Sequence, residues 1–123
     1  PARRTVLDSA LTCAGAHGRS VLDCVITFAS GNDYNSCVSY PGNNVSVIGV
    51  GAIANTGVRS SYSNYGPALD IVAPSNNVGG PGAGVRTTDR MGSNGYNNSN
   101  YTNTFGGTSS ATPVVSGVAA LLP

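Results

Sequence analysis

The sequence predicts an α/β fold, in which a helix, a set of mostly parallel strands and a closing helix pack in layers. Apolar residues recur at helical spacing near the N-terminus. Two nearly unbroken apolar runs, at 21–29 and 45–53, are rich in β-branched residues, as in strands buried within a parallel sheet. A last run of small and apolar residues spans 109–122. The 123 residues are enough for one small domain.

The first expected element is a surface helix from Arg3 to about Ala16. Its apolar residues form one stripe that we expect to be buried, made of Val6, Leu7, Ala10, Leu11 and Ala14. Gly15 and Gly18 are available to end the helix. The run at 21–29 is then expected to be a strand covered on both faces. It breaks at Ser30-Gly31-Asn32. Asn32 is therefore predicted at the carboxyl end of a central strand, where open α/β sheets build their sites.

The rest of the chain continues as strands and loops before a final helix. The segment 45–53 predicts a second buried strand, and shorter strands are expected at 59–62 and 69–72. Two tracts rich in Gly and Asn, at 75–84 and 92–103, predict long surface loops around a short segment at 85–88. The closing helix, 109–122, is expected to be buried nearly all round.

Composition narrows the class of protein. All six basic residues are Arg and all five acidic residues are Asp, so the formal net charge is only +1. The sequence therefore lacks the excess of positive charge that favours binding to nucleic acid or to an anionic membrane. No apolar stretch is long enough to span a membrane. The lack of Lys and Glu, with seventeen Gly and an Asn-rich surface, is more usual in exported than in cytosolic proteins. We therefore expect a secreted or extracytoplasmic protein.

Three cysteines, Cys13, Cys24 and Cys37, permit at most one internal disulfide. The odd number indicates that one thiol is free or is paired with a group outside this chain. Cys13 and His17 lie one helical turn apart, which raises a metal site as an alternative. The cysteine spacings match no common zinc pattern, so a structural disulfide or buried free thiols are favoured.

The segment GGTSSATP places Ser109 between two glycines and the start of the last helix. A serine hydroxyl becomes a nucleophile when a base takes its proton and preorganised donors receive the charge on the substrate oxygen. The glycines would let a substrate backbone approach, and a helix N-terminus offers unpaired N–H groups. The alternative is that Thr108 or Ser109 only caps the helix. The segment departs from the hydrolase motif G-x-S-x-G because Ala111 replaces the second glycine.

Several segments together resemble the subtilisin-like serine peptidases, the subtilases of peptidase family S8. Residues 107–113 match the family's G-T-S-x-A-[ST]-P segment, and ASGN at 29–32 matches its A-x-G-N strand end. YPG, VIGVGAI, SSYSNYGPALDIVAPS and SGVAALL follow in the family's order. The resemblance covers about 21–122. It implies a three-layer sandwich around a mostly parallel sheet, with residues 1–123 as the second, C-terminal half of the catalytic domain.

The resemblance implies a role for each matching residue. Ser109 would be the nucleophile, the Asn32 amide and the Ser109 N–H the oxyanion donors, and Thr108 a supporting donor. The substrate would be a polypeptide, contacted by Gly31, Tyr40, Pro41, Gly42 and Gly107. In the family the Tyr-Pro bond matching Tyr40-Pro41 is often cis, so the same is expected here. The chemistry requires no cofactor; structural calcium is frequent in the family, held largely by backbone carbonyls and upstream residues.

The family's aspartate and histidine motifs are not found in this sequence. His17 lacks the following G-T-x-x-A-G, and Asp8 and Asp23 are expected to be surface charges. The chain by itself is therefore predicted to be inactive, its partner being the remainder of the catalytic domain in the same chain or an associated fragment. One alternative is a degenerate binding or scaffold module without catalysis. A second is a sedolisin-type serine-carboxyl peptidase, which places aspartate where this sequence has Asn32.

Overall fold

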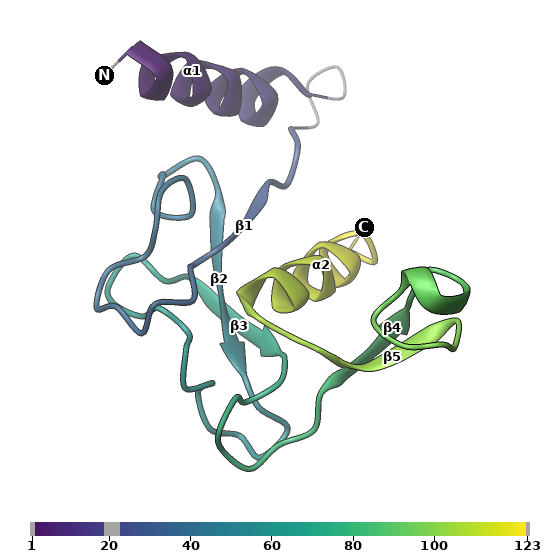
Figure 1. The fold of residues 1–123 in the computed structure, drawn as a ribbon. Coiled ribbons are helices and arrows are strands. Elements are labelled where there is room, and N and C mark those ends of the chain that lie inside the picture. Colours follow the sequence, from purple (N-terminus) through teal and green to yellow (C-terminus); the bar gives the residue numbers. More distant parts are fainter. Residues whose placement is uncertain (1, 19–22, 123) are drawn as a thin grey trace.

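The computed structural model describes residues 2–18 and 23–122. Figure 1 shows the elements in order along the chain. They are α1 (Ala2–His17), β1 (Thr27–Ala29), β2 (Ile48–Ile53), β3 (Ile71–Pro74), β4 (Val85–Thr88), a 3₁₀ turn (Gly92–Asn94), β5 (Tyr101–Phe105) and α2 (Thr108–Ala119). None of the helices within the described ranges is long and apolar enough to cross a membrane.

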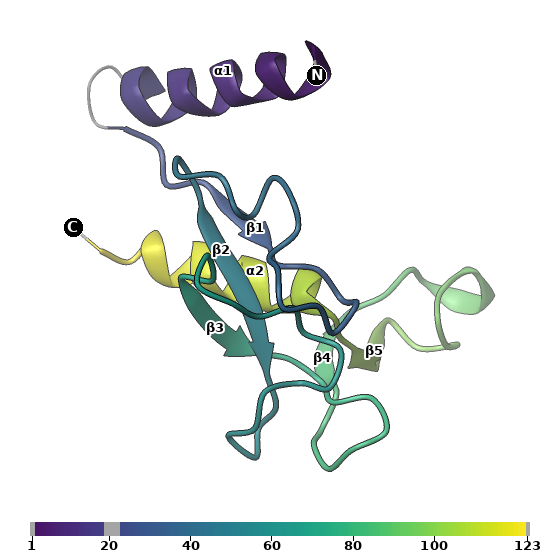
Figure 2. The same ribbon diagram turned by 90° about the vertical axis from the view of Figure 1, so that its left-hand side faces the viewer.

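A parallel sheet with the order β1-β2-β3 forms the centre of the fold. The middle strand, β2, is the buried one, as its continuous apolar sequence predicts. Helix α2 packs across one face of the sheet and contacts all three strands (Figure 2). The shared core consists of Val50, Ala52, Ala73 and Ala111. The predicted α/β class and the parallel sheet are therefore confirmed.

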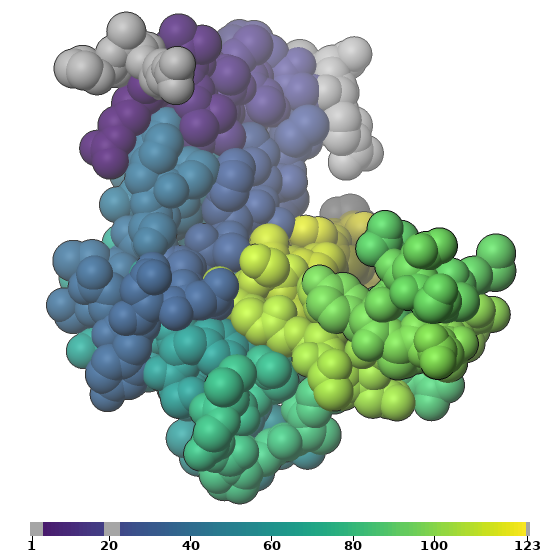
Figure 3. Space-filling model, in the orientation of Figure 1, coloured from purple at the N-terminus to yellow at the C-terminus, as the bar shows by residue number. Residues whose placement is uncertain are grey.

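Helix α2 is less buried than its sequence predicts. Only Thr108, Ser110 and Ala111 are buried, and Val118 is 57% exposed. In the first turn Thr108 bonds to Asn32, Ser110 bonds to Ser75 and Ala111 joins the core, whereas Ser109 is exposed. The later turns meet the sheet with one side only. In Figure 3 the yellow atoms of α2 reach the surface between the blue N-terminal part and the green hairpin. The expectation of burial on all sides is wrong within the described residues.

Helix α1 is confirmed, but its contacts differ from those expected. Of the predicted apolar stripe only Leu11 is buried, and Val6 is 72% exposed. The helix lies apart from the sheet in Figures 1 and 2. Its Asp8 carboxylate instead accepts hydrogen bonds from Tyr40 Oη at 3.2 Å and Asn44 Nδ2 at 2.6 Å. Asp8 is thus a half-buried anchor to the loop before β2, and not the free surface charge predicted.

The strand predicted at 45–53 is confirmed as β2, which begins three residues later, and the other strand predictions need correction. β1 is described over three half-buried residues, so the expected strand covered on both faces is wrong for 23–29, and 19–22 lie outside the described residues. The strand expected at 59–62 is reduced to a single bridge between Arg59 and Ile53. β3 begins two residues later than expected.

Part of the second Gly- and Asn-rich tract is a strand, which the sequence did not indicate. β5 pairs with β4 in an antiparallel hairpin that projects beside α2 (Figure 1). Asp89, at the end of β4, turns the chain back because its carboxylate accepts hydrogen bonds from the backbone N–H groups of Arg90, Tyr96 and Asn97. This local network compensates for the low strand propensity of Asn and Gly.

Candidate active site

The residues predicted to be catalytic meet where β1 ends and α2 begins. Asn32 follows β1, and Thr108 is the first residue of α2. The Asn32 Oδ1 atom accepts hydrogen bonds from the Thr108 N–H at 2.8 Å and from Thr108 Oγ1 at 3.0 Å. These residues are 76 positions apart in the chain. The fold therefore joins the two segments that the sequence singled out separately.

These two hydrogen bonds orient the Asn32 amide. A backbone N–H and the Thr108 hydroxyl both point to one end of it, and an N–H donor requires that end to be the oxygen. The Nδ2 donors are therefore on the opposite side of the amide. Within the described ranges no hydrogen bond involves Nδ2, and the Asn32 side chain is exposed. A ligand oxygen reaching this point would meet an unoccupied N–H donor.

Ser109 lies next to this donor, in the first turn of α2. The N-cap position belongs to Gly107, which has φ 84° and ψ 165° and makes no side-chain capping bond. The hypothesis that Thr108 or Ser109 caps the helix is therefore wrong. The Asn32 amide replaces a cap by accepting from the Thr108 N–H. Ser109 is exposed, and its hydroxyl makes no hydrogen bond within the part of the chain that the structure describes.

The Gly107 turn is held on both of its backbone polar groups. Its N–H donates to Tyr62 Oη at 3.0 Å and to Asn76 Oδ1 at 3.3 Å. Its carbonyl accepts from Ser75 Oγ at 2.9 Å and Ser110 Oγ at 3.1 Å. The three hydroxyls are themselves linked, with Tyr62 Oη to Ser75 Oγ at 2.8 Å and Ser75 Oγ to Ser110 Oγ at 2.7 Å. Side chains of the segment 60–76 thus hold the turn that presents Ser109.

The loop carrying Asn32 is held by another residue that sequence reasoning missed, Asn64. This buried side chain bonds to the backbone on both sides of Asn32, at Ser30 and at Asp33. Neither Tyr62 nor Asn64 carries a sequence signal for this role, because an Asn or Tyr among serines is typical of an ordinary loop. The resemblance covered the segment SSYSNYG without assigning its residues a function.

The predicted substrate-contacting residues fall into two groups. Gly107 lies at the donor site, where an added Cβ would be 3.5 Å from Asn32 Nδ2. At Gly31, with φ 105°, an added Cβ would collide with the Asn64 amide, so glycine is needed there for packing. The Tyr40-Pro41 bond is cis, as predicted.

Tyr40 and Gly42 contact structure other than the Asn32–Thr108 pair. Gly42 is buried against the Ala29 carbonyl at the end of β1. The Tyr40 hydroxyl turns to α1, where it donates to Asp8. The pKa of Tyr40 is raised above its ordinary value near 10. The main cause is partial burial, and the charge and hydrogen bond of Asp8 add to it, whereas Arg4 opposes the shift.

His17 and the cysteines do not gather into a site. His17 is in the last turn of α1, which lies apart from the start of α2 in Figures 1 and 2. All three cysteines are free, so of the two favoured alternatives the disulfide is not formed. The thiols are not buried as expected either, because Cys13 and Cys37 are exposed and Cys24 is half-buried. Over 2–18 and 23–122 no three His, Cys, Asp or Glu side chains cluster as metal ligands. The alternative of a Cys–His metal site is therefore wrong for these residues.

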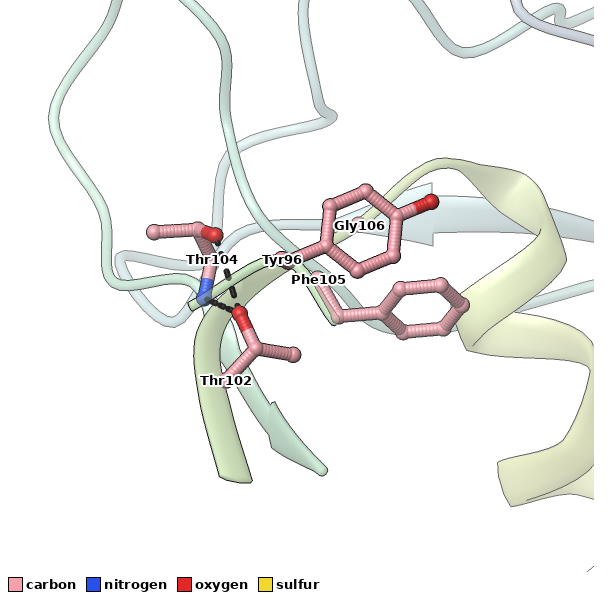
Figure 4. A pocket seen from close by; sticks show the side chains of 5 residues that line it. All are labelled: Tyr96, Thr102, Thr104, Phe105 and Gly106. Atoms are coloured by element: carbon pink, nitrogen blue, oxygen red, sulfur yellow. Dashed lines mark hydrogen bonds between the residues drawn. The ribbon is translucent and has the colours of Figure 1, made fainter. Parts of the chain in front are cut away.

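A cavity opens where β5 leads into the Gly106-Gly107 turn. It has a volume of about 260 Å³ and is lined by Tyr96, Thr102, Thr104, Phe105 and Gly106. Figure 4 shows the rings of Tyr96 and Phe105 together on one side, with the Thr102 and Thr104 hydroxyls hydrogen bonded to each other. An added Cβ at Gly106 would overlap the end of the Asn76 side chain, which would have to move to make room.

The arrangement has the parts of an anion-stabilising site beside a hydroxyl. The first turn of a helix carries unpaired N–H groups that favour developing negative charge. Asn32 adds a side-chain donor whose oxygen is already fixed by Thr108. A donor pair of this kind, next to an exposed serine, suits acyl transfer, in which negative charge develops on a carbonyl oxygen.

Known proteins similar to this chain are named as proteases. The calcium-dependent protease of Trichormus variabilis is 46% identical over 121 residues, covering 85% of this chain and 18% of that protein. The extracellular serine proteinase of Thermus sp. is 38% identical over 118 residues, covering 95% of this chain and 24% of that protein. The chain thus spans less than a quarter of the length of these two relatives.

A solved structure and a sequence profile extend the comparison. The serine protease of Aeromonas sobria superposes with a TM-score of 0.82 over 96% of this chain and 26% of its own, and at 24% identity it supports the fold alone. The profile of the Subtilase family matches residues 4–123. With the parallel sheet, the G-T-S segment at the start of α2 and this match together, the chain belongs to the subtilase family of serine proteases.

Proposed function

We propose that this chain carries the nucleophile and the oxyanion donors of a subtilisin-like serine endopeptidase. The observation that carries the proposal is the pair of hydrogen bonds from Thr108 to Asn32 Oδ1, at 2.8 and 3.0 Å. They hold the free Nδ2 donors beside Ser109. Membership of the subtilase family supports the same roles.

The reaction would proceed through an acyl-enzyme. Ser109 Oγ attacks the carbonyl carbon of the scissile peptide bond and loses its proton to a base. The negative charge moves to the carbonyl oxygen, which accepts hydrogen bonds from Asn32 Nδ2 and the Ser109 N–H. Collapse of this intermediate expels the amine with that proton and leaves the acyl group on Ser109. Water then repeats the attack and releases the acid.

The base and its aspartate would come from the remainder of the catalytic domain, with 1–123 as its second half. An apolar surface supports this arrangement. Ile71, Val72, Val114 and Val118 line a groove of about 180 Å³ between β3 and α2. All four of these side chains are exposed in this structure. Apolar side chains gathered on one face of a sheet and helix are typical of a surface that another layer covers.

The proposed chemistry needs no cofactor, because a hydroxyl nucleophile, a base and two N–H donors suffice. The relative from Trichormus variabilis is called calcium-dependent. Calcium binds clustered oxygen ligands, usually with several carboxylates. Much of the calcium coordination in the family uses backbone carbonyls and residues upstream of this sequence, so we name no calcium ligand in this chain. The composition without Lys and Glu supports a secreted protein, and membership of the subtilase family supports polypeptide substrates.

A fluorophosphonate probe tests the proposal in the protein that carries this chain. The probe reacts with an activated serine, and peptide mapping by mass spectrometry locates the adduct. We expect a single adduct on Ser109, lost in Ser109→Ala. The matched control is Ser116→Ala, which removes an exposed hydroxyl from the same helix and should leave labelling unchanged.

The alternatives predict different outcomes. A scaffold module would give no adduct under native conditions. A sedolisin-type enzyme would be labelled at Ser109, but its activity would be highest in acid and insensitive to Asn32→Leu. Either result would contradict the proposal.

A further inference from the structure

Asn64 is one of the largest fully buried side chains of the protein, with 1% of its surface exposed. It lies between β2 and β3, in a segment without regular structure. A buried amide is costly unless its donors and acceptors are satisfied. The partners of Asn64 therefore indicate why an asparagine occupies this position.

The Asn64 side chain makes four hydrogen bonds. Its Oδ1 accepts from the backbone N–H of Asp33 at 3.0 Å and of Asn35 at 2.9 Å. Its Nδ2 donates to the Ser30 carbonyl at 3.1 Å and to Ser39 Oγ at 3.2 Å. Three of the four partners are backbone groups of the loop that follows β1. Both ends of the Asn64 amide thus bind the loop that follows β1 and its continuation at Ser39.

These contacts enclose Asn32. Ser30 precedes it by two residues and Asp33 follows it directly. Between them, the Gly31 carbonyl accepts from the Asn64 backbone N–H at 3.0 Å. The Asn32 side chain is free of Asn64 and turns to Thr108. The backbone on each side of the oxyanion donor is therefore tied to a single buried residue.

We propose that Asn64 is a positioning residue that sets where the Asn32 amide stands relative to Ser109. This inference rests on the proposed function. An oxyanion donor is effective only when its N–H already points to the place where charge develops. Thr108 fixes the rotation of the Asn32 amide, and Asn64 fixes the backbone from which that amide extends.

The chemistry of the amide explains the choice of residue. One side of the residue must accept hydrogen bonds from two N–H groups, and the other side must donate to two oxygens. The planar amide of asparagine does both. Asn64→Ala would leave the Asp33 and Asn35 N–H groups without their acceptor. The loop would then relax, and a displacement of about 1 Å at a catalytic group costs on the order of 100-fold in rate.

The test is a double-mutant cycle on peptide hydrolysis with Asn64→Ala and Asn32→Leu, in the protein that carries this chain. We expect Asn64→Ala alone to lower kcat by on the order of 100-fold with little change in KM. In the Asn32→Leu background the same change should lower kcat less than about threefold, because the donor it positions is gone.

A stability control separates positioning from folding. Ser63→Ala removes another buried hydrogen-bonding group of the same segment, one that accepts from the Ala52 N–H at 3.0 Å and donates to the Asn64 carbonyl at 3.1 Å, and it leaves the Asn64 side-chain amide with all four of its partners. It should lower Tm and leave kcat near wild type. Hydrogen exchange should quicken at the Asp33 and Asn35 amides in Asn64→Ala, but not in Ser63→Ala. If Asn64→Ala does not fold, Asn64→Ser takes its place in the cycle.

Three results would overturn the inference. The first is an equal loss of kcat in both backgrounds, and the second is unchanged kcat in every folded Asn64 variant. The third is a loss of kcat in Ser63→Ala that matches its loss of Tm. Failure of the proposed function would look different, because the wild-type protein itself would neither hydrolyse peptides nor label at Ser109.

Discussion

Two hydrogen-bonded networks in this protein join segments about thirty residues apart, and they differ in burial and charge. The first links the Asn32 loop to Asn64, across 31 residues at Asp33. The second links α1 to the loop before β2, across 32 residues between Asp8 and Tyr40. Asn64 is buried and its partners are neutral. The second network is half-buried and includes a carboxylate, with Arg4 4.8 Å from the Tyr40 ring centre.

The difference shows which contacts can hold a catalytic group in place. When a buried partner is lost, a polar group remains without a hydrogen bond, at a cost of about 1–3 kcal/mol. When a half-exposed partner is lost, water takes its place. The buried network therefore has one strongly preferred geometry, whereas the network at α1 tolerates change.

The largest change in stability is expected at Gly107, a half-buried residue whose carbonyl is held by the buried hydroxyls of Ser75 and Ser110. Its φ of 84° and ψ of 165° are nearly restricted to glycine, so Gly107→Ala should lower the free energy of unfolding by about 1–3 kcal/mol. The added Cβ would lie in ordinary van der Waals contact with the Asn32 amide, 3.5 Å away, so the cost comes from the backbone conformation. Denaturant unfolding measures the stability change.

Gly15→Ala is the matched control for this glycine. Gly15 lies inside α1 with open space where a Cβ would stand, so alanine should raise stability by about 0.5–1 kcal/mol. Equal stability of Gly107→Ala and the wild type would show that the turn is not constrained as described.

A smaller effect is expected at Tyr40, in the half-exposed network. Its pKa is raised in the folded protein by partial burial and then by Asp8. The folded state therefore favours the protonated phenol, and this contribution to stability is present below about pH 10 and is lost as the pH rises through the folded pKa. Tyr40→Phe should make the free energy of unfolding fall less steeply with pH above 10.

The same variant should leave kcat at neutral pH close to wild type, since the Tyr40 hydroxyl bonds to α1. Urea unfolding at a series of alkaline pH values measures the first effect. A Tyr40→Phe protein that loses alkaline stability as steeply as the wild type would contradict the assignment, as would a loss of turnover as large as that expected for Asn64→Ala.

The sequence was most informative where local pattern and burial agree. The apolar run of β2 and the helical spacing of α1 predicted those elements, and β2 is buried as expected. Asn32 and Ser109 could be singled out because each stands at the end of a recognisable strand or helix. Their connection through Thr108 joins residues 76 positions apart and could only be inferred by resemblance.

The rest depended on tertiary contacts that have no local pattern. β5 lies in an Asn-rich tract, and its pairing with β4 relies on the Asp89 carboxylate gathering backbone N–H groups. Asn64 is polar yet buried, the reverse of what its type predicts. The apolar stripe of α1 was expected to be buried as a whole. Helical spacing shows which residues share one face of the helix, but it says nothing of what covers that face.

The central claim is that Asn32 donates to the oxyanion formed at Ser109. It is tested most directly by kcat for Asn32→Leu in the protein that carries this chain. We expect kcat to fall by about 10²–10³-fold, the loss known for the corresponding asparagine of a subtilisin, with KM nearly unchanged. Tm should fall modestly, because the leucine no longer accepts from the Thr108 N–H at the start of α2. Asn98→Leu, which changes an exposed residue in the loop between β4 and β5, should match the wild type. Unchanged turnover in Asn32→Leu would contradict the account.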